Sequence, residues 1–347
     1  MAGSGRTPVS TAAIKPALRF GLLGCGAISQ IAHLPILAKL RGVSIVALCD
    51  SDSAKARTIA QRFGIPDYFT DIEDLFATDQ LDAVIVATPS HLHEPHVLSA
   101  LRANVDVLCE RPLALTGRGA ERLLVAAERA KRKIMASNPL RFRTDVQALA
   151  GFLHGGELGK VFGVRAGEYH LRRSVEGWRL RRAESGGGAF REYGYSLVDL
   201  ALWLTEFPKP ERVSAHFVRG PGATAVEDTM VVLLTCAGGL AYTFNVTWNY
   251  VGDRDRWSFE VLATTGSARL EPLRVVKDLA GSARDVSPAG APARDGPLVH
   301  SHRAELAHFA SVVRGETPYE PPVDQLTVLR VVEAAYKSAE GECEVRL

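Results

Sequence analysis

The chain has 347 residues, of which 46% are hydrophobic and 23% charged, the balance of a globular protein long enough for two domains. A formal net charge of +2 without a long basic run argues against nucleic acid or a membrane surface as partner. Five scattered cysteines without a C-x-x-C pair argue against disulfides and favour a reducing cytoplasm, and no apolar run approaches the roughly 20 residues of a membrane helix.

The N-terminal segment lacks the apolar core of a secretory signal, so we expect a loose tail at 1–17. Apolar runs then alternate with helical patterns from 18 to 137, where Ser53 is expected to cap one helix and Gly64 to end it. The predicted strands are 18–23, 43–48, 81–87, 105–109 and 133–136, and the predicted helices are 28–40, 54–63, 94–103 and 119–131. Strands separated by helices of this length predict a parallel sheet covered on both faces.

The pattern changes in 138–347, which we expect to form a second α/β domain. The turn Ala237-Gly238-Gly239 predicts a hairpin, and 281–297, rich in Ala, Pro, Gly and Asp, predicts a mobile loop. The predicted strands are 161–170, 212–219, 229–236, 240–250 and 257–264, and the predicted helices are 144–154, 305–313 and 326–340. Long consecutive strands predict a large, mainly antiparallel open sheet.

A glycine turn, Gly24-Cys25-Gly26-Ala27-Ile28-Ser29, follows the first predicted strand and opens a helix. Gly24 permits the tight turn, and Gly26 leaves room for backbone N–H groups to approach a pyrophosphate. Ser29 replaces the third glycine of this fingerprint and is small enough for close packing. The context predicts an N-terminal Rossmann domain whose dinucleotide is held by Gly24, Gly26, Ala27 and Ile28.

Asp50 ends the second predicted strand, 24 residues after Gly26. This spacing suits an acid that hydrogen-bonds the ribose 2′-OH of a dinucleotide. A carboxylate at that place repels a 2′-phosphate, so we expect NAD, with NADP disfavoured. The alternative is that Asp50 merely caps the following helix.

Three further segments are 87–93 (ATPSHLH), 109–114 (CERPLA) and 186–190 (GGGAF), the last followed by Gly194 and Asp199. With the glycine turn, they resemble the glucose–fructose oxidoreductase/inositol dehydrogenase/MocA family of NAD(P)-dependent sugar oxidoreductases, over nearly the whole chain. The resemblance implies a Rossmann domain, a second domain with an open sheet, and a homodimer or homotetramer formed through that sheet. It also implies that the nicotinamide is bordered by Thr88, Pro89, His93, Glu110 and Arg111.

Two departures from the family pattern concern catalysis. The family's Glu-Lys-Pro is Glu110-Arg111-Pro112 here, and arginine is a poor proton acceptor because it stays protonated. In the family's Asp-x-Gly-x-His-x-x-Asp, Glu192 replaces the first Asp, Ser196 replaces the His, and Asp199 keeps the last Asp. Oxidation of an alcohol still needs a group that takes the hydroxyl proton.

His170, Tyr195 and Glu192 are the candidate replacements for the missing proton acceptor. The reference pKa of histidine, near 6.5, suits His170 to this task. We expect the substrate cleft to be faced by Arg111, His170, Tyr195, Ser196 and Asp199. Three functions remain open: hydride transfer on a sugar, a sensor or partner protein that binds NAD without turnover, and a redox-neutral enzyme whose NAD cycles within each turnover.

Three other groups of residues have more than one interpretation. His91, His93 and His96 lack a standard zinc spacing, so we expect no metal. The segment 172–182, with five arginines around Trp178, is either a solvated loop or a lid that holds an anionic substrate such as a uronate, another sugar acid or a phosphorylated sugar. The aromatic residues Trp248, Tyr250, Trp257 and Phe259 are expected to pack on a sheet or between subunits.

Overall fold

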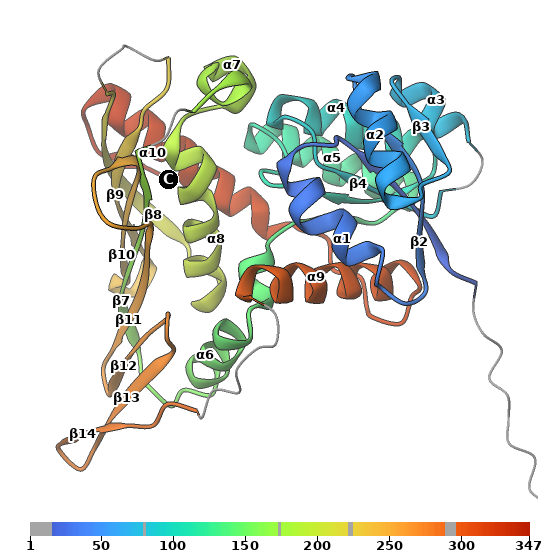
Figure 1. Ribbon diagram of the computed structural model, residues 1–347. Coiled ribbons are helices and arrows are strands. Elements are labelled where there is room, and N and C mark those ends of the chain that lie inside the picture. Colours follow the sequence, from blue (N-terminus) through green and yellow to red (C-terminus); the bar gives the residue numbers. More distant parts are fainter. Residues whose placement is uncertain (1–15, 79–80, 173–174, 221–224, 289–295) are drawn as a thin grey trace, which may run out of the picture.

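The structure is a computed structural model that describes residues 16–78, 81–172, 175–220, 225–288 and 296–347 (Figure 1). The expected tail at 1–17 therefore lies almost entirely outside the described residues. No helix in the described part of the chain is long and apolar enough to cross a membrane. All five cysteines are free thiols, as their scattered spacing predicts.

The N-terminal sheet has six parallel strands in the order β3-β2-β1-β4-β5-β6. Every residue of β4 and β5 is buried, which confirms the predicted sheet covered on both faces. The short strand β3 and the helix α3 (Ile72–Ala77) were not predicted. Strand β3 has only three residues, two of them exposed, and α3 has only one buried residue, so neither gives a periodic pattern. The strands are β1 (Leu18–Leu23), β2 (Val43–Cys49), β3 (Asp67–Phe69), β4 (Ala83–Val86), β5 (Asp106–Cys109) and β6 (Ile134–Ala136).

The helices of this domain differ in detail from the prediction. The expected helix 28–40 is a π-helical turn, Ser29–His33, followed by α1 (Leu34–Leu37), consistent with the missing N–H of Pro35. The cap of α2 (Ser53–Phe63) is Asp52, which accepts a hydrogen bond from the Lys55 N–H at 3.0 Å, and not Ser53. Gly64 ends α2 at φ +66°, as predicted. The other two are α4 (His93–Arg102) and α5 (Gly117–Ala130).

The second sheet has nine strands in the order β14-β13-β12-β11-β7-β10-β9-β8-β15. Only β7 and β10 pair in parallel among these strands, so the prediction of a mainly antiparallel sheet is confirmed. The expected loop 281–297 is partly wrong: β14 pairs with β13, a helix begins at Pro297, and 289–295 lie outside the described residues. The strands are β7 (Val161–Leu171), β8 (Pro210–Val218), β9 (Thr229–Cys236), β10 (Ala241–Tyr250), β11 (Arg256–Ala263), β12 (Gly266–Arg269), β13 (Arg274–Leu279), β14 (Ser282–Asp285) and β15 (Val345–Arg346).

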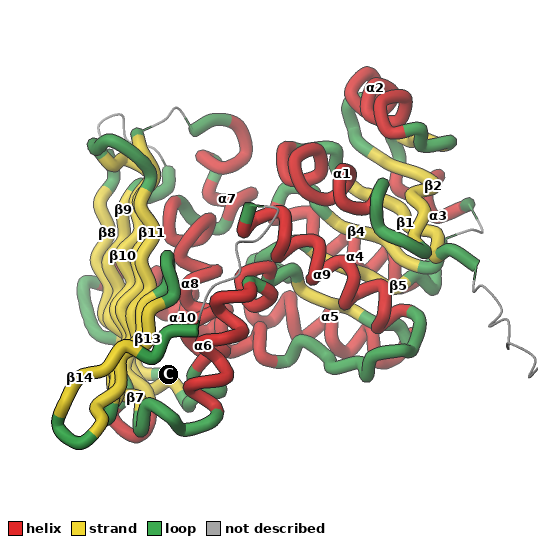
Figure 2. Tube along the Cα trace, turned by 60° about the horizontal axis from the view of Figure 1, so that its bottom comes forward, coloured by secondary structure: helices red, strands yellow, loops and turns green. Residues whose placement is uncertain are grey.

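Helices α6 (Thr144–His154), α8 (Tyr195–Leu204) and α10 (Asp324–Gly341) lie on the face of this sheet that looks toward the Rossmann domain (Figures 1 and 2). The opposite face carries no helix among the described residues. Strand β9 alternates between buried and exposed residues and presents Val231 and Leu233 there, 47% and 44% exposed. This is the open face that the sequence pattern predicts.

Helix α9 (Pro297–Val313) belongs to the second half of the sequence but packs on the Rossmann domain. Its Leu306, Phe309 and Ala310 are buried in one core with Phe20, and the Phe20 and Phe309 rings lie 5.6 Å apart. The expected boundary at 137/138 therefore does not hold for α9. An amphipathic pattern shows that a helix has a buried face but does not show which sheet covers that face.

Candidate active site

A cavity of about 650 Å³ lies beyond the carboxyl ends of β1 and β4, where the strand order of the parallel sheet reverses. Open α/β sheets bind their ligands at such switch points. Residues of both domains line the cavity. The Rossmann domain contributes the glycine turn, Asp50, Lys55, Thr88, Pro89, His93, Glu110 and Arg111, and the second domain contributes Trp178, Arg179, Ser185, Gly187, Gly188, Arg191, Glu192 and Trp248.

The glycine turn has the backbone that a dinucleotide requires. Gly24 has φ +92°, and a Cβ atom there would lie 2.5 Å from the Ala87 carbonyl oxygen. A Cβ atom on Gly26 would meet nothing within 4 Å, so this glycine leaves open space beside the cavity. Ser29 donates a hydrogen bond to the Gly24 carbonyl oxygen at 2.6 Å, closing the turn. Ala27 and Ile28 also line the cavity, beside the open space at Gly26.

Asp50 joins the glycine turn to the next helix. One carboxylate oxygen accepts a hydrogen bond from the Cys25 N–H at 2.8 Å. The other accepts from the Asp52 N–H at 3.0 Å and lies 2.8 Å from the Lys55 ammonium. Since Asp52 is the cap of α2, Asp50 is not the capping residue, and its carboxylate lines the cavity beside Lys55.

His93 connects the two loops that follow β4 and β5. Its Nδ1 lies 2.7 Å from the Pro112 carbonyl oxygen, and its Nε2 lies 2.8 Å from the Thr88 carbonyl oxygen. Burial lowers the pKa of His93. With both ring nitrogens facing backbone oxygens, His93 has no nitrogen left for a metal ion. The described residues contain no group of three or more histidine, cysteine or acidic side chains placed to hold one.

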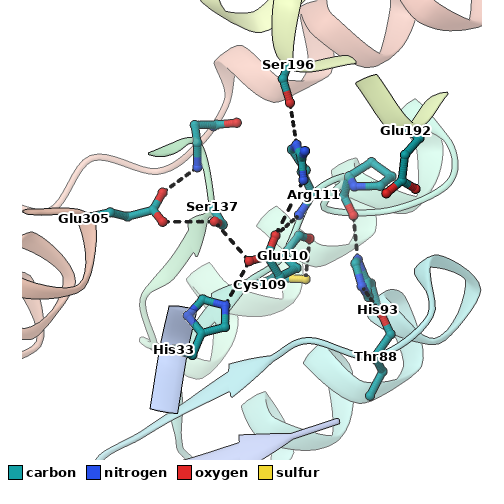
Figure 3. A network of polar contacts seen from close by, with 12 residues as sticks. His33, Thr88, His93, Cys109, Glu110, Arg111, Ser137, Glu192, Ser196 and Glu305 are labelled. Atoms are coloured by element: carbon teal, nitrogen blue, oxygen red, sulfur yellow. Dashed lines mark hydrogen bonds and ion pairs between the residues drawn. The ribbon is translucent and has the colours of Figure 1, made fainter. Parts of the chain in front are cut away.

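Arg111 follows Glu110 into the cavity and meets the second domain (Figure 3). Its Nε donates a hydrogen bond to the Ser196 hydroxyl. Glu110 is buried, and its carboxylate lies 2.9 Å from Nε2 of His33. Burial would raise the pKa of Glu110, but the hydrogen bond and charge of His33, together with Arg111, lower it to about 2. Two of the three positions that depart from the family pattern, Arg111 and Ser196, thus contact each other.

Tyr195 and Asp199 were expected to face the substrate cleft, and the structure corrects this. The Tyr195 phenol is buried and donates a hydrogen bond to Gln325 at 2.7 Å. Asp199 forms an ion pair with Arg141 at 2.5 Å and accepts from Gln325 at 2.8 Å. Residues four apart share one helix face, and this face of α8 packs against α10, whereas Ser196 points to Arg111.

His170 was also expected in the cleft and does not line the cavity. Its Nε2 lies 2.8 Å from Glu168 and its Nδ1 lies 3.1 Å from Asp255, while the ring stacks on Tyr193 at 4.0 Å. Burial lowers its pKa, but the hydrogen bonds and charges of the two carboxylates outweigh burial and raise it. An imidazole held between two carboxylates favours its protonated form and is a poor proton acceptor.

Glu192 is the one candidate acceptor from the sequence that lines the cavity. Its carboxylate lies 3.4 Å from Nε of Arg179, whose guanidinium stacks over Trp178 at 4.8 Å. The other described arginines of 172–182 do not line the cavity: Arg172 bonds Asn249, Arg181 pairs with Glu184, and Arg182 pairs with Glu340. Arg173 lies outside the described residues.

Several cavity or supporting residues were missed by sequence reasoning. Trp248 lines the cavity, although aromatic residues in strands were expected to pack on the sheet or between subunits. His33, Ser137 and Glu305 surround Glu110 but are separated from it by 27 residues or more in the chain. No local motif marks such positions, because only the fold brings them together.

A six-stranded parallel sheet with a glycine turn at its switch point, sharing a cavity with a second sheet, defines a Rossmann-type nucleotide-binding protein. Residues 18–138 match the model of an oxidoreductase family with an NAD-binding Rossmann fold, and residues 146–269 match the GFO/IDH/MocA C-terminal domain. The chain is 30% identical to D-apiose dehydrogenase of Paraburkholderia graminis, over 98% of this chain and 92% of that protein. The chain belongs to the GFO/IDH/MocA family of oxidoreductases.

Solved structures show the same architecture. The aldose-aldose oxidoreductase of Caulobacter crescentus, complexed with glycerol, is 26% identical with a TM-score of 0.82, over 95% of this chain and 100% of that one. A levoglucosan dehydrogenase in complex with NADH and levoglucosan has a TM-score of 0.84 at 23% identity, over 95% of this chain and 99% of that one. The second likeness concerns the fold alone. The fold class and the family resemblance inferred from the sequence are both confirmed.

Proposed function

We propose that this protein transfers hydride between NAD and a CH–OH carbon of a sugar or sugar acid. The observation that carries this proposal is the single cavity lined by the glycine turn on one side and by Arg111 and Glu192 on the other. D-apiose dehydrogenase and the aldose-aldose oxidoreductase, to which the chain is 30% and 26% identical, support a sugar-derived substrate.

Gly24, Gly26, Ala27 and Ile28 would hold the dinucleotide phosphates, and Asp50 would accept hydrogen bonds from a ribose. The bound nicotinamide supplies the hydride chemistry. The carboxylate of Asp50 disfavours a 2′-phosphate and supports NAD over NADP, although the neighbouring ammonium of Lys55 offsets part of its charge. Thr88, Pro89, His93, Glu110 and Arg111 line the part of the cavity where we place the nicotinamide.

The residues of the chain have two further tasks, which are to orient the substrate and to transfer the hydroxyl proton. Arg111 Nε donates a hydrogen bond to Ser196, which is buried and does not line the cavity, so the serine fixes the direction of the guanidinium group. Arg111, which does line the cavity, therefore orients the reacting hydroxyl or carbonyl group. Glu192 takes the hydroxyl proton during oxidation and returns it during reduction, since it is the carboxylate that lines the cavity on the side of the second domain.

The cations at the cavity point to an anionic sugar derivative, because guanidinium groups pair with carboxylates in two parallel hydrogen bonds. Arg111 and Arg179 line the cavity, and their guanidinium groups would face a uronate or another sugar acid. Substrates with a carboxylate should therefore show a lower KM than the matching neutral sugars. Equal KM values for a uronate and its aldose would contradict this part of the proposal.

The open face of the second sheet, with Val231 and Leu233, supports a homodimer or homotetramer. Sedimentation of the wild type and of Val231→Glu with Leu233→Glu tests the assembly, and a monomeric wild type would contradict it. We place the protein in the cytoplasm, which its five unpaired thiols support.

The test of function is a panel of aldoses, alditols and uronates with NAD or NADP, followed by absorbance of the reduced nicotinamide. Glu192→Gln should lower kcat by about 10²-fold or more. Glu184→Gln, which removes a partly exposed carboxylate that is paired with Arg181 and lies outside the cavity lining, should leave kcat unchanged. NAD binding without turnover would instead indicate a sensor, and product without net reduced cofactor would indicate a redox-neutral enzyme.

A further inference from the structure

A chain of polar side chains lies beneath Arg111 in an otherwise apolar interior (Figure 3). His33, Ser137 and Glu305 are buried with Glu110, and they come from the π-helical turn, the end of β6 and helix α9. Ser137 Oγ lies 3.0 Å from one oxygen of Glu305 and 3.4 Å from one oxygen of Glu110. The other oxygen of Glu305 accepts a hydrogen bond from the Asn138 N–H at 2.5 Å.

The proton count of this chain is constrained by Ser137. A serine hydroxyl has one hydrogen and can donate it to only one of the two carboxylates. If both were ionised, one buried oxygen would face the serine lone pairs, and two negative charges would share one buried site. One additional proton removes both conflicts: a protonated carboxyl group donates to Ser137 Oγ, and Ser137 donates to the ionised partner.

The surroundings decide which carboxylate holds that proton. The groups that face the pair are His33, Arg111, the Cys109 thiol and His302 on α9, whose own pKa is lowered by burial. The hydrogen bond from His33 and the charge of Arg111 act on Glu110, and they lower its pKa. Burial raises the pKa of Glu305 to about 8, and the negative charge of Glu110 acts in the same direction.

We propose that Glu305, Ser137, Glu110 and His33 form a directed hydrogen-bond chain in which Glu305 carries the proton and Glu110 is ionised, and that this chain positions Arg111 at the active site. The ionised Glu110 accepts from the Arg111 N–H at 3.3 Å, and Nη1 of Arg111 lies 3.9 Å from the same oxygen. Glu305 and His33 do not line the cavity and act through Glu110 as positioning residues. The consequence for turnover rests on the proposed role of Arg111, whereas the location of the proton does not.

Two isosteric substitutions at the ends of the chain test the assignment. In Glu305→Gln the amide replaces a neutral carboxyl group, donating to Ser137 and accepting from Asn138, so NADH affinity and kcat should stay within about twofold. In Glu110→Gln the carboxylate that contacts His33 and attracts Arg111 is lost, and kcat should fall on the order of 10²-fold because Arg111 is misplaced. KM for a neutral sugar should change much less. An equal loss of kcat in Glu305→Gln and Glu110→Gln would overturn the proposal.

Infrared difference spectroscopy gives a readout that needs neither substrate nor turnover. The wild type at pH 7 should show the carbonyl band of a protonated carboxyl group, and this band should vanish in Glu305→Gln and persist in Glu110→Gln. Absence of the band in the folded wild type would overturn the proton assignment. If the band is present and no sugar is turned over, the proposed function fails while the proton assignment stands. Ser137→Ala, which breaks the chain without changing a carboxyl group, should shift the band and keep it.

Discussion

Two acidic residues follow strands of the same parallel sheet, Asp50 after β2 and Glu110 after β5, and they obtain their partners in different ways. Asp50 bonds to groups within two to five residues of itself, apart from the Cys25 N–H of the glycine turn. Glu110 contacts His33 and Ser137 and is linked through the serine to Glu305. The first carboxylate is held by local geometry, and the second is held by the packing of distant elements.

Because the two carboxylates are held differently, substitutions near them should have different effects. Asp50 lines the cavity with an ammonium beside it, so its carboxylate is open to the ribose that we propose to bind there. Glu110 is buried among partners that are themselves buried and come from three distant elements. We therefore expect changes near Asp50 to alter the choice of cofactor, and changes near Glu110 to alter the order of the site and the response to pH.

The largest effect should come from the turn that Asp50 supports. Gly24→Ala forces a side chain at φ +92° against the Ala87 carbonyl, so we expect roughly 2–4 kcal/mol lower stability and loss of NADH binding. Gly64→Ala is the matched control, because Gly64 also has positive φ but has open space around it. It should cost about 1 kcal/mol and leave NADH affinity unchanged. Titration with NADH, followed by fluorescence, measures the affinity of both variants. Equal NADH affinities in Gly24→Ala and Gly64→Ala would contradict the expectation.

The second effect concerns the buried chain at Glu110. The folded-state pKa of Glu305 is raised from 4.5 to about 8, so the folded protein retains a proton that the unfolded chain releases within this window. Wild-type stability should then fall, relative to Glu305→Gln, as the pH rises from about 5 to 8, by about 3–4 kcal/mol in total. Denaturant unfolding at several pH values measures this, with Glu260→Gln on an exposed position of β11 as control. If the difference in unfolding free energy between the wild type and Glu305→Gln did not change with pH, the assignment of the proton to Glu305 would be contradicted.

Cofactor choice should respond to Asp50 with a smaller effect. Asp50→Ser removes the carboxylate and frees the Lys55 ammonium, so NAD affinity should fall about tenfold, and NADP affinity should rise, because a 2′-phosphate is no longer repelled. Asp52→Ser, which keeps a capping hydroxyl on α2, is the control and should leave the NAD to NADP ratio unchanged. An unchanged ratio in Asp50→Ser would mean that another residue sets the preference.

The smallest effects on turnover are expected at Tyr195 and His170, two of the residues that were expected in the cleft and do not line the cavity. Tyr195→Phe leaves Gln325 Oε1 without its donor and should lower stability by about 1–2 kcal/mol. His170→Asn removes an imidazole that bridges the carboxylates of Glu168 and Asp255 at a partly exposed position. Because neither side chain lines the cavity, both variants should keep kcat within about twofold. Loss of turnover in either folded variant would restore that residue as a catalytic candidate.

Part of the site could be predicted from the sequence because its signals are local. The glycine turn, Asp50 and the loops at Thr88 and Glu110 each follow a predicted strand, and parallel strands bring their carboxyl ends to one edge. Helix α8 shows where such reasoning fails. Tyr195, Ser196 and Asp199 are close in sequence, but only Ser196 faces Arg111, and the rotation of a helix that is apolar on nearly all sides cannot be read from its pattern.

The sequence by itself determined the Rossmann domain, the family, the glycine turn and the two departures at Arg111 and Ser196. These are properties of short segments, fixed by residue type and spacing. The tertiary structure alone decided that Arg111 and Ser196 contact each other, that His170 is held between carboxylates, and that α9 returns to the first domain and places Glu305 beneath Glu110. Buried polar partners are chosen by the packing of distant elements, because an enclosed charge must find its hydrogen bonds wherever the fold supplies them.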